Sequence, residues 1–133
     1  MSARKPGHRE IAIQRAYEDP TAHDGYRVLV DRFWPRGRSK ETLALDEWAR
    51  DLAPDAELIG WFGHDPARWQ EFRTRYRKEL AGAAQRERLH ALLAAAGDRR
   101  ITLVYGARSD TENQAVVLRE ALQAMSGTRG PAG

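Results

Sequence analysis

The fold is decided by residues 26–40, which read YRVLVDRFWPRGRSK. The run from Val28 to Val30 is aliphatic without a polar interruption, as is typical of a strand that is covered on both faces of a sheet. This strand leads directly into a turn that is rich in cations. In an open α/β sheet, ligands bind at the carboxyl ends of the strands. The sequence therefore predicts a ligand site at the end of this strand, with a preference for anions.

Two other segments resemble strands, so the sheet is predicted to contain residues 11–17, 26–32 and 101–107. The last of these, ITLVYGA, is again a continuous apolar run. Residues 18–25, EDPTAHDG, are dense in Asp, Pro and Gly and are predicted to form a loop. Strands that alternate with helices indicate a parallel sheet. The expected fold is a single three-layer α/β domain with a small, mostly parallel sheet.

Between the second and third predicted strands, the apolar residues recur at helical spacing and predict four helices and no strand. The first ends before Pro54, the second has Pro54 in its first turn, the third starts at Asp65-Pro66, and the fourth ends at Gly97. A fifth helix is predicted after a capping box with Ser109 as N-cap. The predicted inward positions, helix by helix, are Leu45, Trp48 and Leu52; Leu58, Ile59 and Phe62; Trp69, Phe72, Tyr76 and Leu80; Leu89, Leu92, Leu93 and Ala96; and Ala115, Leu118, Leu122 and Met125.

The length and composition favour one soluble domain. The 133 residues are enough for one core, predicted over 11–125, with flexible tails at 1–10 and 126–133. No apolar run approaches the roughly 20 residues that span a bilayer, and the N-terminal stretch lacks the apolar centre of a secretory signal. The absence of cysteine excludes disulfides and thiolate chemistry and fits a bacterial cytoplasm.

Two predicted strand ends converge on the candidate site. Parallel packing of the second and third strands would bring the turn at 31–37 next to 105–110, where a helix start favours an anion. Arginine side chains there would supply paired donors for phosphate or carboxylate. Asp31 is the catalytic candidate, and the predicted ligand-binding residues are Arg32, Trp34, Arg36, Gly37, Arg108, Ser109 and Asn113.

A structural interpretation of the same residues stays open. Arg32 would then pair with Asp31 or with an acid on a helix, and Trp34 would only close the sheet edge. No metal or cofactor site is predicted, because no two histidines share a helical spacing and no nucleotide-binding or esterase motif occurs. His64, beside several aromatic residues, is the histidine best placed for a role.

Several motifs together resemble one family. These are YRVLVDRFWPRG, LALDEW, WFGHDPARWQEFRTRYRKEL and LVYGARSDTENQAVVL, which cover roughly residues 11–124. In this combination and order they resemble the YeaO-like bacterial proteins of domain of unknown function 488. The resemblance implies a compact cytosolic α/β domain whose hallmark is the turn from Asp31 to Gly37.

The chain departs from this family at one position of interest. More distant members carry a Cys-His-Arg element at the start of the last helix, where this chain has Asn113, Gln114 and Ala115. Closer relatives often have a histidine where this chain has Gln114. A mechanism that needs that thiol or imidazole is therefore not expected here.

Three functions are compatible with the sequence. The first is binding of a small anionic ligand, with or without catalysis. The second is an interaction module or homodimer in which aromatic helices bury surface between protomers. The third is nucleic-acid binding through the basic turn at 27–40 and the arginine-rich helix at 68–78. A net charge of +3 is too small to indicate nucleic-acid binding by itself, and acids are interspersed among the basic residues of that helix. The first function is favoured, and no contact with a membrane is expected.

Overall fold

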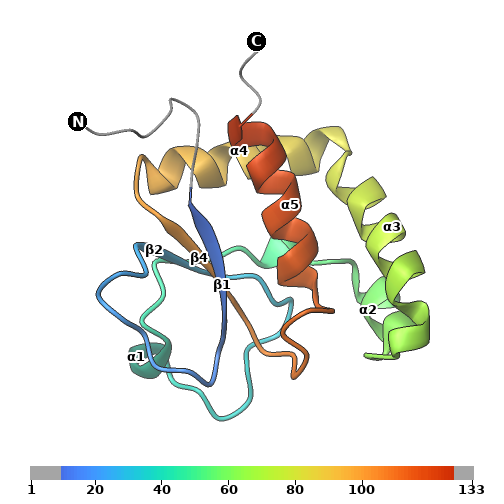
Figure 1. Ribbon diagram of the computed structural model, residues 1–133, viewed down its shortest axis with the longest axis horizontal. Helices are drawn as coiled ribbons and strands as arrows, with labels where there is room; N and C mark the ends of the chain where they lie inside the picture. Colours follow the sequence, from blue (N-terminus) through green and yellow to red (C-terminus); the bar gives the residue numbers. More distant parts are fainter. Residues whose placement is uncertain (1–9, 128–133) are drawn as a thin grey trace.

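A parallel four-stranded sheet with the order β1-β4-β2-β3 organises the computed structural model, which describes residues 10–127 (Figure 1). Its strands are β1 (Ile11–Arg15), β2 (Tyr26–Leu29), β3 (Glu47–Trp48) and β4 (Ile101–Tyr105). Every residue of β4 is buried, and this strand lies between β1 and β2. The predicted α/β domain is confirmed, as is the pairing of the second and third predicted strands.

Five α-helices accompany the sheet: α1 (Lys40–Leu43), α2 (Ala56–Phe62), α3 (Trp69–Leu80), α4 (Ala83–Ala96) and α5 (Gln114–Gly127). Short 3-10 helices occupy Arg50–Leu52 and Pro66–Arg68. In Figure 1 the larger helices α3, α4 and α5 lie on one side of the sheet, and α1 lies on the other. No helix of the described residues has the length and apolar character that crossing a membrane requires.

The main core lies under the larger helices. The stripe predicted for the third helix is confirmed, because Trp69, Phe72, Tyr76 and Leu80 are all buried in α3. The Tyr76 hydroxyl donates to the carbonyl of Leu52 at 2.6 Å, so its polar end is satisfied inside the core. The predicted end of the fourth helix is also correct, since Gly97 follows α4 with a φ of 66°.

The opposite face of the sheet has a much smaller core. Ala16, Leu29, Leu43 and Val104 form it, and Trp34 and Leu45 pack against its edge. A one-turn helix and loops therefore provide the third layer of the predicted three. Because little apolar surface is buried on this face, polar contacts contribute more to its stability.

The first helix predicted after residue 40 is wrong. Leu45, Trp48 and Leu52 have helical spacing, but α1 ends at Ala44, which has a φ of 48°. The chain then extends beside β2, where the amides of Asp46 and Ala49 donate to the carbonyls of Arg27 and Leu29. Pairing with β2 overrides a periodicity of only three residues and produces β3.

The last helix begins later than predicted. Ser109 Oγ accepts from the amide of Glu112 at 2.9 Å, but this closes a turn that precedes the helix. The side chain of Asn113 accepts from the amide of Val116 at 3.2 Å, so Asn113 caps α5. The helix ends at Gly127, two residues into the predicted C-terminal tail; the rest of that tail and residues 1–9 lie outside the described residues.

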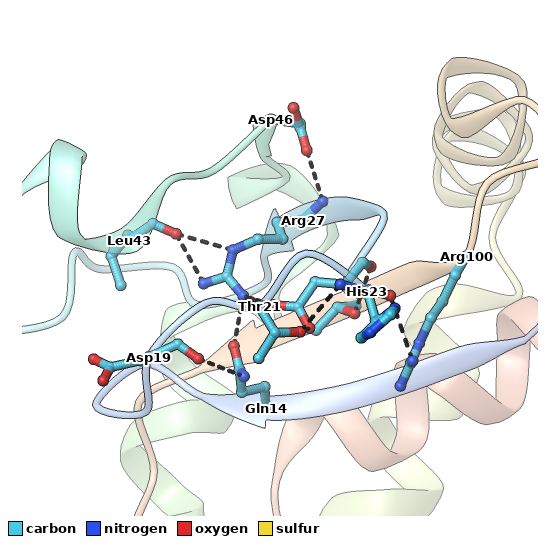
Figure 2. Close-up of polar contacts among 10 residues, drawn as sticks. Gln14, Asp19, Thr21, His23, Arg27, Leu43, Asp46 and Arg100 are labelled. Atoms are coloured by element: carbon cyan, nitrogen blue, oxygen red, sulfur yellow. Dashed lines mark hydrogen bonds and ion pairs between the residues drawn. The ribbon is translucent and has the colours of Figure 1, made fainter.

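A buried arginine joins the elements on the thin face (Figure 2). The Arg27 side chain is 4% exposed and forms an ion pair with Asp24 at 2.7 Å. It also donates to the Leu43 carbonyl from Nε and Nη2, at 3.0 and 2.8 Å, and to Gln14. Burial raises the pKa of Asp24, but hydrogen bonds from Thr21 and Arg27 outweigh this effect and hold it below its usual value. One guanidinium thus connects β1, β2, α1 and the loop that precedes β2.

Replacing this arginine should destabilise the domain strongly. We expect Arg27→Met to lower the free energy of unfolding by about 3–5 kcal/mol, because the Asp24 carboxylate stays buried without its partner. Urea denaturation measures the loss, and Arg86→Met on the exposed side of α4 should change stability by less than about 0.5 kcal/mol. A loss below about 1 kcal/mol for Arg27→Met would show that the network is not a major source of stability.

Candidate ligand site at the strand ends

A cavity of about 280 Å³ lies at the carboxyl ends of β2 and β4, next to the start of α5. In Figure 1 the strands run towards the lower edge of the view, where α5 begins and α2 lies close by. The cavity combines aromatic, aliphatic and charged groups. Its lining residues are Tyr17, Asp31, Arg32, Phe33, Trp34, Pro35, Arg36, Pro54, Ile59, Phe62, His64, Phe72, Gly106, Ala107 and Gln114.

The Asp31 carboxyl group bridges three elements at this cavity. It follows β2, and its Oδ2 accepts from the amide of Gly106 at 2.9 Å, just beyond β4. Its Oδ1 accepts from the side-chain amide of Gln114 at the start of α5. The carbonyl of Asp31 accepts from Trp48 Nε1 at 2.7 Å. This residue therefore fixes the relative position of two strand ends and a helix start.

The close approach of Asp31 explains why glycine occupies position 106. A Cβ atom built on Gly106 would lie 2.8 Å from Asp31 Oδ2, which is closer than real Cβ contacts. A glycine at a strand end can let another group approach the backbone closely. In the structure, the group that approaches it is the Asp31 carboxylate.

The environment of Asp31 disfavours its charge. Burial raises the pKa of the Asp31 carboxyl to about 6, although the hydrogen bonds from Gly106 and Gln114 oppose that rise. No ion pair to Asp31 occurs within residues 10–127. The cavity thus contains an acid that two hydrogen bonds stabilise but no cation neutralises.

The structure gives Arg32 a role other than the two that were predicted, which were binding a ligand anion and pairing with an acid. Its Nε donates to the carbonyl of Pro54 at 2.9 Å, and its Nη2 lies 3.4 Å from the carbonyl of Ala53. It thereby holds the segment before α2 against the end of β2. Arg32 still lines the cavity, but two backbone carbonyls occupy part of its donor capacity, and it forms no ion pair with Asp31.

The turn after β2 places two further arginines near Tyr17. Arg36 is exposed and lines the cavity, and its carbonyl accepts from the Tyr17 hydroxyl at 2.9 Å. The Arg38 guanidinium lies 5.8 Å from the centre of the Tyr17 ring. Its Nε and Nη2 are buried and have no hydrogen-bond partner among the described residues. Gly37 has a φ of 80°, which lets the turn bring both arginines to this side.

Some of the predicted ligand-binding residues lie together and some do not. The structure brings Asp31, Arg32, Trp34 and Arg36 to the cavity, whereas Gly37, Arg108, Ser109 and Asn113 are absent from its lining. Asn113 is 1% exposed and is used as a cap, and Ser109 closes the preceding turn. The late start of α5 is the reason, because it turns this loop into a local hydrogen-bonded structure.

Sequence reasoning missed much of the apolar wall. Phe62 and Phe72 were predicted at inward positions of their helices, and their stacked rings, whose centroids lie 4.3 Å apart, also line the cavity. His64 lines it as well and adopts a φ of 59°, which is unusual for a residue other than glycine. Gln114 stood out in the sequence only as a departure from related proteins, and the structure gives it a direct contact with Asp31.

Arginines of the segment at 68–78 form ion pairs with acidic residues of the same chain. Arg68 pairs with Asp65, Arg73 with Glu120 and Arg75 with Glu71, so these charges are partly neutralised. Arg68 and Arg75 also lie over the Trp61 ring. No group of three potential metal-ligating side chains occurs in the part of the chain that the structure describes.

Comparisons with known proteins agree on one family. A family model described as "Inactive DUF488-N3 subclade" matches residues 10–130. The Escherichia coli K12 protein named "Uncharacterized protein YeaO" is 39% identical over 115 residues, which are 86% of this chain and 98% of that protein. The Mycobacterium tuberculosis H37Rv protein named "Uncharacterized protein Rv3073c" is 38% identical over 112 residues, 84% of this chain and 92% of that protein. No solved structure shows a significant match.

A methyl group at position 106 should disrupt the strand ends. We expect Gly106→Ala to lower the free energy of unfolding by about 1–3 kcal/mol, because it displaces the Asp31 carboxylate. Gly60→Ala in α2 is the matched control, since its Cβ would meet no atom within 4 Å, and it should stabilise the protein by up to about 1 kcal/mol. Equal effects of the two substitutions in urea denaturation would contradict the contact between Asp31 and Gly106.

The raised pKa of Asp31 makes its contribution to stability depend on pH. The folded state binds this proton more tightly than the unfolded chain, so the contribution falls as pH rises from about 4 to about 6. Asp31→Asn should therefore gain stability over the wild type across this range, reaching about 3 kcal/mol at pH 7. Urea denaturation at each pH measures the difference. Asp110→Asn, whose exposed side chain lies outside the cavity, should show no such increase, and a flat difference for Asp31→Asn would contradict the prediction.

Proposed function

The chain belongs to the YeaO-like DUF488 family, and we propose that it binds a small organic molecule carrying a phosphate or carboxylate group in the cavity at the ends of β2 and β4. The observation that carries this proposal is an aromatic cavity that Arg36 lines, next to Arg38, whose Nε and Nη2 have no acceptor among the described residues. Small-molecule sites in proteins are mostly apolar hollows with a few well-placed polar groups. They are common at the carboxyl ends of parallel strands.

The apolar wall suits a small ring or chain. Ile59, Phe62 and Phe72 contribute from α2 and α3, and Phe33, which is 60% exposed, contributes from the turn after β2. Burial of an apolar group against such a wall yields roughly 25 cal/mol per Å². The wall alone supports binding but does not select a charge.

The arginines of the turn select an anion. Arg36 contributes a cation to the lining, and Arg38 lies against Tyr17, another lining residue. Two buried guanidinium nitrogens of Arg38 have lost water without gaining an acceptor among the described residues. Such groups are costly unless an acceptor reaches them. A phosphate or carboxylate placed between Arg36 and Arg38 would supply that acceptor through charge-assisted hydrogen bonds.

The proposed role is binding without turnover. The matching subclade is described as inactive, and the chain contains no cysteine that could act as a nucleophile. Asp31 and His64 are candidate acids or bases in the lining of the cavity, but Asp31 accepts hydrogen bonds from Gly106 and Gln114 that give it a positioning role. Ligand binding explains the cavity without assigning a reaction to it.

A thermal-shift experiment tests the proposal with phenyl phosphate and benzoate, and with benzyl alcohol as the uncharged counterpart. At 100 times its dissociation constant, a bound ligand stabilises by about 2.7 kcal/mol. This corresponds to an increase of roughly 10 °C in melting temperature for a domain of this size. We expect the two anions to raise the melting temperature and benzyl alcohol to have a much smaller effect.

Substitution locates the anion. Arg38→Met should weaken binding of phenyl phosphate at least tenfold in a calorimetric titration, whereas Arg86→Met, on a distant helix, should leave it unchanged. A shift that is equal for the anions and benzyl alcohol would contradict the role of the arginines. No shift with any of the three compounds would contradict the proposed function and favour a role in protein interaction.

A further inference from the structure

We propose that the inner end of this ligand carries N–H donors on a planar cationic group, such as an amidinium or guanidinium, that bind Asp31 and Gln114. This inference rests on the proposed function and adds a second recognition element to it. The anionic end would lie at the arginine turn, and the donor end would lie between the strand ends and α5. The ligand would thus be a small zwitterion with a flat, conjugated donor group.

The inner end of the cavity offers acceptors. Each oxygen of an ionised carboxyl group can accept two hydrogen bonds. Asp31 Oδ2 receives one from Gly106 and Oδ1 receives one from Gln114, so both retain capacity. The Gln114 side-chain oxygen accepts no hydrogen bond from any described residue. Three oxygen atoms therefore remain able to accept from a ligand.

Several of the donors nearby are occupied. The Gly106 amide is used by Asp31, and Arg32 directs Nε to Pro54 and Nη2 to Ala53. Trp48 Nε1 is bound to the backbone of Asp31. An anion placed at this inner end would face the Asp31 carboxylate with few free donors. A donor group would instead satisfy the acceptors that remain.

The charge of Asp31 also lacks compensation. No ion pair reaches it within residues 10–127, and burial raises its pKa to about 6, because the site disfavours an isolated negative charge. A buried carboxylate without a cationic partner is costly, and a ligand cation that pairs with it removes that cost. Among the described residues no cation forms an ion pair with Asp31, and the neighbouring Arg32 directs two of its donors to backbone carbonyls instead.

The aromatic wall favours a planar cation over a compact ammonium. Phe62 and Phe72 present stacked rings 4.3 Å apart, and Trp34 and Tyr17 also line the cavity. A flat, weakly hydrated cation stacks on aromatic faces while it donates hydrogen bonds in its own plane. Amidinium and guanidinium groups combine these properties, and their paired N–H groups match a carboxyl group.

A calorimetric titration of the full chain with 4-amidinobenzoate and benzoate tests this inference. The two compounds share the ring and the carboxylate and differ in the amidinium. We expect 4-amidinobenzoate to bind at least tenfold more tightly than benzoate. Asp31→Asn should remove this advantage, weakening 4-amidinobenzoate and strengthening benzoate, because the repelling carboxylate is lost.

Controls separate this inference from the proposed function. Asp110→Asn, at the same end of the sheet but outside the cavity, should keep the tenfold advantage. Gln114→Leu removes one acceptor and should reduce the advantage severalfold, so it serves as a second variant if Asp31→Asn folds poorly. Equal affinities of the two compounds, or an advantage that survives both substitutions, would overturn the inference while benzoate binding still supports the proposed function. Failure of both compounds to bind would overturn both.

Discussion

The buried guanidinium of Arg27 is the interaction on which the thin side of the domain depends. Only four small or medium apolar residues form the core there, so dispersion and hydrophobic burial contribute less than on the helical side. Arg27 compensates by donating to acceptors from three other segments, namely β1, α1 and the loop that precedes β2 (Figure 2). These hydrogen bonds help to stabilise the arrangement of β1, β4 and β2 on the face of the sheet that no large helix covers. The turn that follows β2 can then project beyond a fixed strand.

At the carboxyl end of the sheet, the Asp31 side chain also connects several elements, but its contacts have a different effect on stability. Asp31 also joins β2 to β4 and to a helix, yet its partners are two amides instead of a cation. Arg27 and Asp24 neutralise each other, whereas Asp31 is half-buried and forms no ion pair with any described residue. Stability alone would be better served by asparagine at this position. Groups whose pKa is shifted by burial in a cavity are concentrated at functional sites.

The sequence was sufficient for the parts of the fold that long, regular patterns specify. The α3 stripe and the buried run of β4 were predicted because many apolar residues agree with one period. The segment from Leu45 to Leu52 was mispredicted because three apolar residues fit a helix, while pairing with β2 depends on backbone contacts that no periodicity reports. The start of α5 was misplaced since Ser109 closes a turn that resembles a cap.

The candidate site was predicted in position but only partly in composition. A parallel sheet brings strand ends together, so Asp31 and Arg36 could be placed near β4 from sequence alone. The partner of each charge could not be predicted, because Arg32 has carbonyl acceptors and Asp31 has amide donors that lie 21 to 83 residues away. These pairings change the chemistry of the site. Arg32 directs its donors to backbone carbonyls and forms no ion pair with Asp31, so the Asp31 oxygens can still accept hydrogen bonds at the inner end of the cavity. Arg36 and Arg38 lie at the turn, and the zwitterionic ligand that we propose would match both ends.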